Sequence, residues 1–210
     1  MKASKFSMSL AAAGLSLVVG VAHAAPVVTI ATSNAGGAST SGLAGFQTDG
    51  DDMVGMRVTG FFADQSNEAL SWTATGSNAG GVSGLFSVGL SGDTFNADWV
   101  VTTSKTLTGL FFEGQPGDTL FDRTNPSPGT AGSAQGADFD YRGDSLDGTI
   151  DVTYSRPLSL TGDPAVGDLW VNMFVDLAGL DNGGLLADQT LRYRQDTMVH
   201  NELSNFKRTL

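Results

Sequence analysis

The feature that most constrains the fold is a two-residue alternation of apolar and polar side chains in the C-terminal half of the chain. Over residues 149–161 the apolar side chains share one parity, and they are Ile150, Val152, Tyr154, Leu158 and Leu160. Because successive side chains of a strand point to opposite faces, this pattern predicts a strand with one face in a core and the other in water. The alternation recurs over 168–177, and turn residues at 181–184 lead to a third segment at 188–196. We therefore predict three strands in an antiparallel meander.

Shorter segments through the rest of the chain also predict strands, at residues 26–32, 53–63, 68–75, 85–90, 96–103 and 106–113. The last of these has apolar residues on both parities, which indicates burial from both sides. The chain has 28 glycines, and its acidic residues are 19 aspartates and three glutamates, a balance that favours turns over helix interiors. The sequence predicts an all-β fold, namely an antiparallel β-sandwich of about eight to ten strands with little helix, and a jelly roll is the alternative arrangement.

The first 24 residues have the pattern of a signal peptide. Lys2 and Lys5 give a basic start, residues 10–21 are apolar, and Ala22-His23-Ala24 is a small-x-small cleavage box. The apolar run is shorter than the roughly 20 residues of a membrane span, so we expect no integral membrane segment after cleavage. We predict export through the Sec pathway, a single domain over residues 25–197 and a C-terminal tail over residues 198–210.

Charge and cysteine content exclude several classes of partner. The chain has 11 basic and 22 acidic residues, and loss of the leader would change its net charge from −11 to −13. A protein this acidic repels nucleic acid, so we expect no nucleic-acid partner. The chain has no cysteine, which excludes disulfides and thiolate chemistry.

Few residues point to catalysis. His200 is the one histidine outside the leader, so a serine–histidine–aspartate triad would depend on it, and no histidine or cysteine spacing fits zinc. A glycosidase needs two nearby carboxyl groups, but 19 aspartates would form such a pair by chance. We therefore expect a protein that is not an enzyme and assign no catalytic residue.

Calcium is the one cofactor that the sequence leaves open. One acidic cluster contains Asp49, Asp51 and Asp52, and a second contains Asp138, Asp140, Asp144 and Asp147. Oxygen-rich loops of exported proteins suit Ca²⁺. The second cluster begins like an EF-hand, with Gly143 in sixth place, but Arg142 stands at a ligand position and Thr149 replaces the final glutamate. The EF-hand interpretation therefore fails, and a calcium site in a loop stays a hypothesis.

Two aromatic residues offer a site for carbohydrate. In the strand predicted at 168–177, the inward row is Leu169, Val171, Met173, Val175 and Leu177, so Trp170 and Phe174 point to the other face. Exposed rings on a sheet could stack on sugar rings. The alternative is a central strand with both faces covered.

Several short motifs between about residues 109 and 196 resemble a known family. They are Gly117-Asp-Thr-Leu-Phe-Asp122, Pro128-Gly-Thr-Ala-Gly-Ser-Ala-Gln-Gly136, Ile150-Asp-Val-Thr-Tyr154, Leu158-Ser-Leu-Thr-Gly-Asp-Pro-Ala-Val-Gly-Asp-Leu-Trp170 and Arg194-Gln-Asp-Thr197. Over less than half of its length, the chain resembles ectodomains of exported bacterial proteins of the PEP-CTERM type, which an exosortase processes at the cell surface. The resemblance implies an extracellular β-sandwich of the envelope, exopolysaccharide matrix or biofilm of a Gram-negative bacterium.

The end of the chain departs from that family. Its members normally end in Pro-Glu-Pro, an apolar helix and a basic cluster, whereas residues 198–210 contain Lys207 and Arg208 without an apolar span. The usual C-terminal anchor is therefore not visible, which leaves open a freely released protein or an altered end.

Three hypotheses of function follow. The first is a secreted, non-enzymatic protein of the cell surface or biofilm matrix, acting in adhesion or assembly with polysaccharide, other matrix proteins or copies of itself. The second is a carbohydrate-binding module that recognises exopolysaccharide through Trp170 and Phe174. The third is a secreted hydrolase of the glycoside hydrolase type that uses two aspartates.

Overall fold

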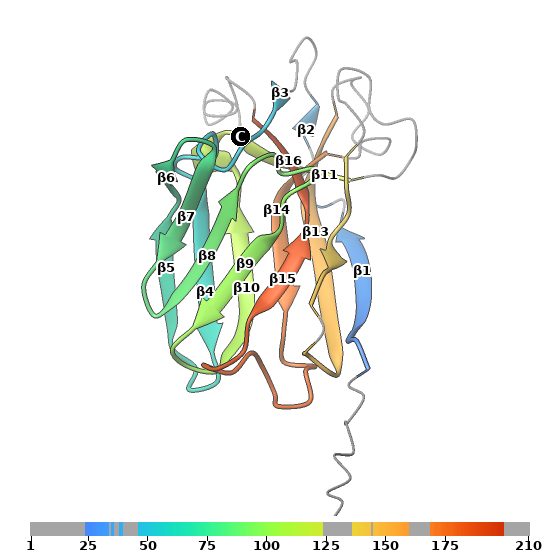
Figure 1. Cartoon of the computed structure of the whole chain (residues 1–210). Helices are drawn as coiled ribbons and strands as arrows, with labels where there is room; N and C mark the ends of the chain where they lie inside the picture. The colour runs from blue at the N-terminus through green and yellow to red at the C-terminus, as the bar shows by residue number, and fades with distance from the viewer. Residues whose placement is uncertain are drawn as a thin grey trace, which may run out of the picture.

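The computed structural model describes residues 24–33, 35, 38–39, 46–123, 136–143, 145–159 and 169–199, and these residues form strands and connecting turns. The one helical element among them is a single 3-10 turn, η1 (Gln115–Gly117). The strands form two sheets that lie face to face (Figure 1). The prediction of an all-β sandwich with little helix is confirmed.

The larger sheet has ten strands. They are β1 (Val27–Ser33), β2 (Ala38–Ser39), β3 (Phe46–Gln47), β4 (Arg57–Phe62), β5 (Asn67–Ser71), β10 (Leu107–Glu113), β11 (Thr119–Asp122), β13 (Thr149–Ser159), β14 (Leu169–Asp176) and β16 (Asp196–Val199). The smaller sheet consists of β6 (Thr73–Gly76), β7 (Ala79–Ser83), β8 (Phe86–Ser91), β9 (Trp99–Thr103), β12 (Asp140–Tyr141) and β15 (Leu191–Arg194). These are more strands than predicted. Two predicted segments are divided where the chain passes between the sheets, and the short strands β2, β3, β7, β11 and β12 were not predicted.

The order of the strands places β1 and β6 at opposite sides of the sandwich. The larger sheet runs β5-β4-β10-β14-β13-β1 along one line of pairing, and the smaller runs β6-β7-β8-β9-β15-β12. In Figure 1, β5 and β6 lie at the left and β1 at the right. Among the described strands, β1 and β2 pair with β13 in parallel and all other pairs are antiparallel.

An aromatic cluster fills the centre of the sandwich. The centre of the Trp99 ring lies 5.2 Å from that of Trp72, 5.9 Å from that of Phe112, which it meets edge to face, and 5.9 Å from that of Tyr193, with which it stacks. These side chains have no more than 1% of their surface exposed. Since they come from both sheets, their contact joins the two layers.

Two of the crossings between the sheets are made at single buried residues. Trp72 separates β5 from β6, and its Nε1 donates to the Gly50 carbonyl oxygen at 2.7 Å. Gln195 separates β15 from β16, and its Nε2 donates at 2.8–3.3 Å to the carbonyl oxygens of Asp122, Ala137 and Asp196. The Tyr154 hydroxyl donates to Gln195 Oε1. Both crossings therefore satisfy main-chain or side-chain polar groups that burial removes from water.

The predicted meander is correct for two strands and wrong for the third. β13 and β14 pair antiparallel, from Asp151 opposite Asp176 to Leu158 opposite Leu169. The segment predicted at 188–196 instead enters the smaller sheet as β15 and returns to the larger sheet as β16. Alternation shows that a segment is a strand, but it does not identify the sheet that the strand joins.

Within β13 and β14, residues of the same parity do not all point into the same cluster. Ile150, Val152 and Tyr154 lie in the main core, as predicted, whereas Leu158 packs with Leu169 in a second cluster. Between these two groups, Arg156 has a left-handed backbone with φ of 57°, which interrupts the ladder. Val171 joins the second cluster and Trp170 joins the main core, contrary to the predicted inward row.

One predicted boundary can be compared with the strands. β16 extends through Met198 and Val199, so the sheet continues two residues past the domain end predicted at residue 197. Leu160, the rest of the predicted tail and the predicted signal peptide up to residue 23 lie outside the described residues.

The Gln195 crossing predicts a large loss of stability on substitution. Gln195→Leu removes the donor for three buried carbonyl oxygens and the acceptor of the Tyr154 hydroxyl, so we expect unfolding to require about 3–5 kcal/mol less free energy. Urea denaturation followed by tryptophan fluorescence measures the change. The matched control is Gln189→Leu, where only the bond from the Leu186 N–H at 3.0 Å is lost. Equal losses in the two variants would contradict a special role for the crossing.

Candidate functional site

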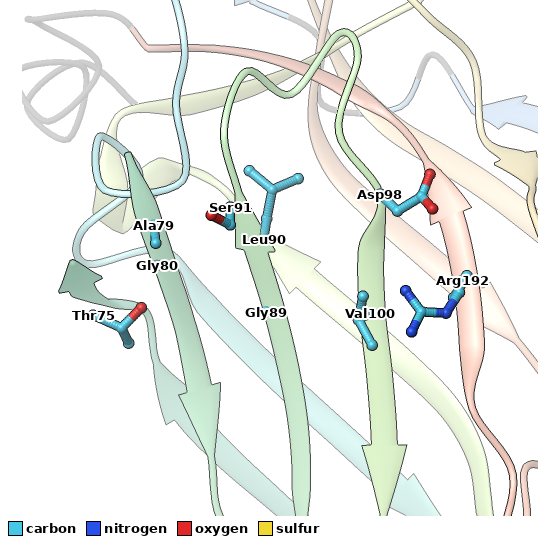
Figure 2. Close-up of a pocket in the computed structure, with 9 residues that line it drawn as sticks. All are labelled: Thr75, Ala79, Gly80, Gly89, Leu90, Ser91, Asp98, Val100 and Arg192. Atoms are coloured by element: carbon cyan, nitrogen blue, oxygen red, sulfur yellow. The ribbon is translucent and has the colours of Figure 1, made fainter. Parts of the chain in front are cut away.

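The outer face of the smaller sheet is hollowed along β7 and β8. Figure 2 shows the first hollow, of about 350 Å³, which is lined by Thr75, Ala79, Gly80, Gly89, Leu90, Ser91, Asp98, Val100 and Arg192. A second hollow of about 310 Å³ shares four of these residues with it, namely Thr75, Gly80, Gly89 and Val100. A third of about 270 Å³ shares Ser83 and Ser87 with the second. We call this continuous depression the sheet trough.

Small residues in the two central strands create the sheet trough. Gly81 and Gly89 lie directly opposite each other in β7 and β8, and Ser83 lies opposite Ser87. A Cβ at Gly81 would be 2.5 Å from the Val88 carbonyl oxygen, so glycine is required there. At Gly89 the nearest atom to such a Cβ would be the Gly80 oxygen at 3.9 Å, which leaves the floor open to the outside.

The polar groups that the sheet trough offers come from side chains. β7, β8 and β9 are all paired on both sides, so ladder hydrogen bonds use their main-chain donors and acceptors. Hydroxyl groups of serine and threonine remain along the walls, and the Ser87 and Thr102 hydroxyls lie 2.7 Å apart. Asp98 and Arg192 stand on the β9 and β15 side of the first hollow (Figure 2). The trough can therefore recognise a ligand that both donates and accepts hydrogen bonds.

The residues predicted to stack on sugar lie elsewhere and differ in exposure. Trp170 is only 5% exposed, and its ring lies in the main core, 6.5 Å from Tyr154. Phe174 is half-buried and meets the Phe61 ring edge-on at 6.1 Å. β14 lies between β13 on one side and β10 and β11 on the other, so it is a central strand, as the alternative expected, although the Phe174 ring remains partly exposed. The prediction of an exposed ring is wrong for Trp170.

The first acidic cluster does come together. The carboxylates of Asp49, Asp51 and Asp52 have oxygen atoms within 4.8 Å of one another. The main-chain N–H of Asp49 donates to Asp52 Oδ2 at 2.8 Å. An isolated antiparallel β-bridge pairs the main chains of Asp49 and Asp93. Desolvation raises the pKa of Asp49, and repulsion from Asp52, Asp93 and Asp51 adds to the shift. A cation bound here would relieve that repulsion, and hard oxygen ligands suit Ca²⁺.

The second acidic cluster is neutralised by arginines instead. Asp138 accepts hydrogen bonds from Arg123 at 2.9 and 3.3 Å. Asp140 forms ion pairs with Arg142 at 2.8 Å and Arg194 at 3.5 Å. Asp144 lies outside the described residues, and Asp147 joins no metal-binding group among the described residues. Among the described residues, Asp138, Asp140 and Asp147 are therefore not gathered into a group that could hold a metal ion.

A buried carboxyl group beside the first cluster was not predicted from the sequence. Asp196 is 7% exposed, and its Oδ1 accepts from the Thr94 hydroxyl at 2.7 Å and from the Thr197 N–H at 2.9 Å. Burial raises the pKa of Asp196 to about 6, because desolvation outweighs these hydrogen bonds. Asp122 lies opposite Asp196 in β11 and β16, also buried. Neither of the two lines the sheet trough, and a start-of-strand aspartate gives no sequence signal of burial.

The comparisons with known proteins add no relative. No protein family, no curated protein and no solved structure matches this chain. Within the described residues, no helix has the length and apolar character needed to cross a membrane. His200 lies outside those residues, so the structure gives no geometry for a triad.

The calcium hypothesis is decided by thermal unfolding. An ion at the first acidic cluster stabilises the folded chain by mass action, so the melting midpoint should rise with millimolar CaCl₂ and fall in chelator. The double variant Asp51→Asn/Asp52→Asn should lose this calcium response. A midpoint that is the same in calcium and in chelator rejects a stabilising site.

Asp196 predicts a pH dependence with a definite sign. Because its folded-state pKa of about 6 exceeds the unfolded value of about 3.8, the folded chain binds more protons between these pH values. Its contribution to stability therefore falls as pH rises from 4 to 6, by about 2–3 kcal/mol in total. Asp196→Asn removes this titration. The stability of the variant relative to the parent protein should therefore increase as pH rises. Urea unfolding from pH 4.5 to pH 7.5 tests this, with the exposed Asp181→Asn as the control.

Proposed function

We propose that the chain is a secreted, non-enzymatic protein of the bacterial cell surface or biofilm matrix, which adheres to a neutral polysaccharide through the sheet trough. The observation that carries the proposal is a long open depression with hydroxyl groups along its walls on the outside of a rigid sheet. The leader and the resemblance to exported surface proteins support the location. The proposal therefore combines the hypotheses of an adhesive matrix protein and of a carbohydrate-binding module, with the sheet trough as the binding surface.

The shape of the sheet trough favours an extended polymer. Its three hollows follow one another along β7 and β8, so a ligand that fills them must be long and narrow. An extended peptide would gain its main affinity by adding to a free strand edge, but the floor strands are paired on both sides. Sugar hydroxyls both donate and accept, as do the serine and threonine hydroxyls along the walls. Polysaccharide is thus the better match.

Charge favours a neutral polysaccharide over an anionic one. The chain carries a net charge of −11, so an anionic polymer is repelled at long range. Asp98 and Arg192 are the charged residues lining the three hollows, and their charges balance. Both can form charge-assisted hydrogen bonds to hydroxyl groups without requiring a charge on the ligand.

The same lining supports adhesion over hydrolysis. Asp98 is the one carboxylate among the residues that line the three hollows. Glycoside hydrolysis by the usual mechanisms uses two carboxyl groups that flank the scissile bond. The trough therefore offers contacts to a polysaccharide without the pair that would cleave it.

The proposal predicts the effect of filling the sheet trough. Gly89→Gln places a side chain on the open floor, and we expect retention by neutral polysaccharides to fall at least tenfold. Replacing a strand glycine should leave the melting midpoint unchanged or slightly higher. Affinity electrophoresis in gels containing dextran, galactomannan or hydroxyethylcellulose measures binding, and alginate provides the anionic comparison.

The matched control for this experiment is Ala69→Gln on the exposed edge strand β5, which should bind like the parent protein. Equal retention of the Gly89→Gln and parent proteins would remove the trough as the binding surface. If none of the neutral polymers retains the parent protein, the proposed function is wrong.

A further inference from the structure

The outer edge of β1 has no partner among the described strands. β1 pairs on one side with β13, from Val27 opposite Thr149 to Ser33 opposite Ser155. The Val27 N–H donates to the Gly148 oxygen at 2.8 Å. Because alternate residues of a parallel strand bond to the same neighbour, the N–H and C=O groups of Val28, Ile30 and Thr32 point away from β13. β1 therefore offers a row of main-chain donors and acceptors.

This edge lacks the features that usually block pairing. Natural edge strands are protected by charged side chains, proline, bulges or short length. β1 is seven residues long and contains no charge and no proline. Among the other described edges, β5 carries Glu68, β6 has four residues, β2 and β3 have two each, and β12 has two, one of which is Asp140. β1 is thus the long uncharged edge of the sandwich.

Two apolar side chains on β1 remain exposed. Val27 is 63% exposed and Ile30 is 37% exposed, although Val152, opposite Ile30 in β13, is 1% exposed. Val28 of β1 still packs against the main core, but Ile30 reaches beyond its cover. A strand placed beside β1 would cover Ile30 and would satisfy the free main-chain groups at the same time.

We infer that this edge pairs with β1 of a second copy of the chain, antiparallel across a two-fold axis, so that the two larger sheets become continuous. The outward groups of three residues fix the register. When Ile30 lies opposite Ile30 of the second copy, Val28 lies opposite Thr32 on both sides, and all outward groups find partners. Any other register leaves some of them unpaired.

Electrostatics explains why a second copy can approach at this place. Copies with a net charge of −11 repel each other, and the repulsion is strongest where carboxylates face one another. The seven residues of β1 carry no charge, and the two-fold axis brings these two uncharged strands together. Since the contact is one strand wide, we expect a dimer whose population depends on concentration.

A single cysteine tests the register, because the chain has no cysteine of its own. In protein secreted with its own leader, Ile30→Cys places two thiols opposite each other at a Cα separation of about 5.5 Å, which a disulfide can span. Mild oxidation with copper phenanthroline should therefore give a disulfide-linked dimer on non-reducing gels. Thr32→Cys alone should give little, because its own copy lies about four residues away along the strand, roughly 13 Å.

The control for random collision is Ala69→Cys on the exposed edge strand β5, which should cross-link no faster than Thr32→Cys. Ile30→Lys provides a second measurement, because two like charges would face each other at the axis. Sedimentation equilibrium of the parent protein should show a mass that rises toward two chains with concentration, and Ile30→Lys should weaken dimerisation at least tenfold.

Two results would overturn the inference. One is equal cross-linking at residues 30, 32 and 69, and the other is a parent protein that stays monomeric at the highest concentration reached. Neither result bears on the sheet trough, since a monomer would still be retained by polysaccharide. Conversely, loss of polysaccharide binding in Gly89→Gln should leave dimerisation unchanged.

Discussion

The contact around Trp99 is the interaction on which the rest of the structure depends. A chain without cysteine has no disulfide to join its layers, so burial between the sheets must hold them together. Trp99 contacts Trp72 at one crossing between the sheets, and its Nε1 donates to the Gln195 oxygen at the other, at 2.9 Å. One side chain thus links two of the places where the chain changes sheet. Each crossing is held by large buried groups that pack only when the two sheets are together.

Because the large side chains of the smaller sheet point into the core, its outer face can consist of small residues. In β9, Trp99 and Val101 point inward and are fully buried, while Val100 and Thr102 point outward. In β8, Phe86 and Val88 fill the core, so Ser87 and Gly89 can leave the outside hollow without loss of core volume. The alternation that creates the core also separates it from the trough. A ligand surface can therefore change in such a strand while the packing behind it stays the same.

The features that the sequence predicted are set within one segment of the chain. The features that it missed depend on contacts between segments that are far apart in the sequence. Strands such as β13 follow from alternation within the segment itself, and Asp49, Asp51 and Asp52 lie together because they are adjacent in the chain. The trough depends on Gly81 lying opposite Gly89, a register set by the whole sheet. The second acidic cluster is altered by Arg123 and Arg194 from other segments. The burial of Trp170 follows an interruption of the ladder at Arg156, which precedes Pro157, a residue that marks an irregular strand.

The trough and the β1 edge can act together because they lie at opposite sides of the sandwich. The trough follows β7 and β8 near the crossing from β5 to β6, whereas β1 closes the far side of the larger sheet (Figure 1). Pairing through β1 would therefore leave both troughs of a dimer open. Two weak sites on one rigid dimer bind a long polymer more tightly than either alone, because the second contact forms at high effective concentration. A concentration-dependent dimer would then adhere best where the protein accumulates, which is the behaviour that a matrix component needs.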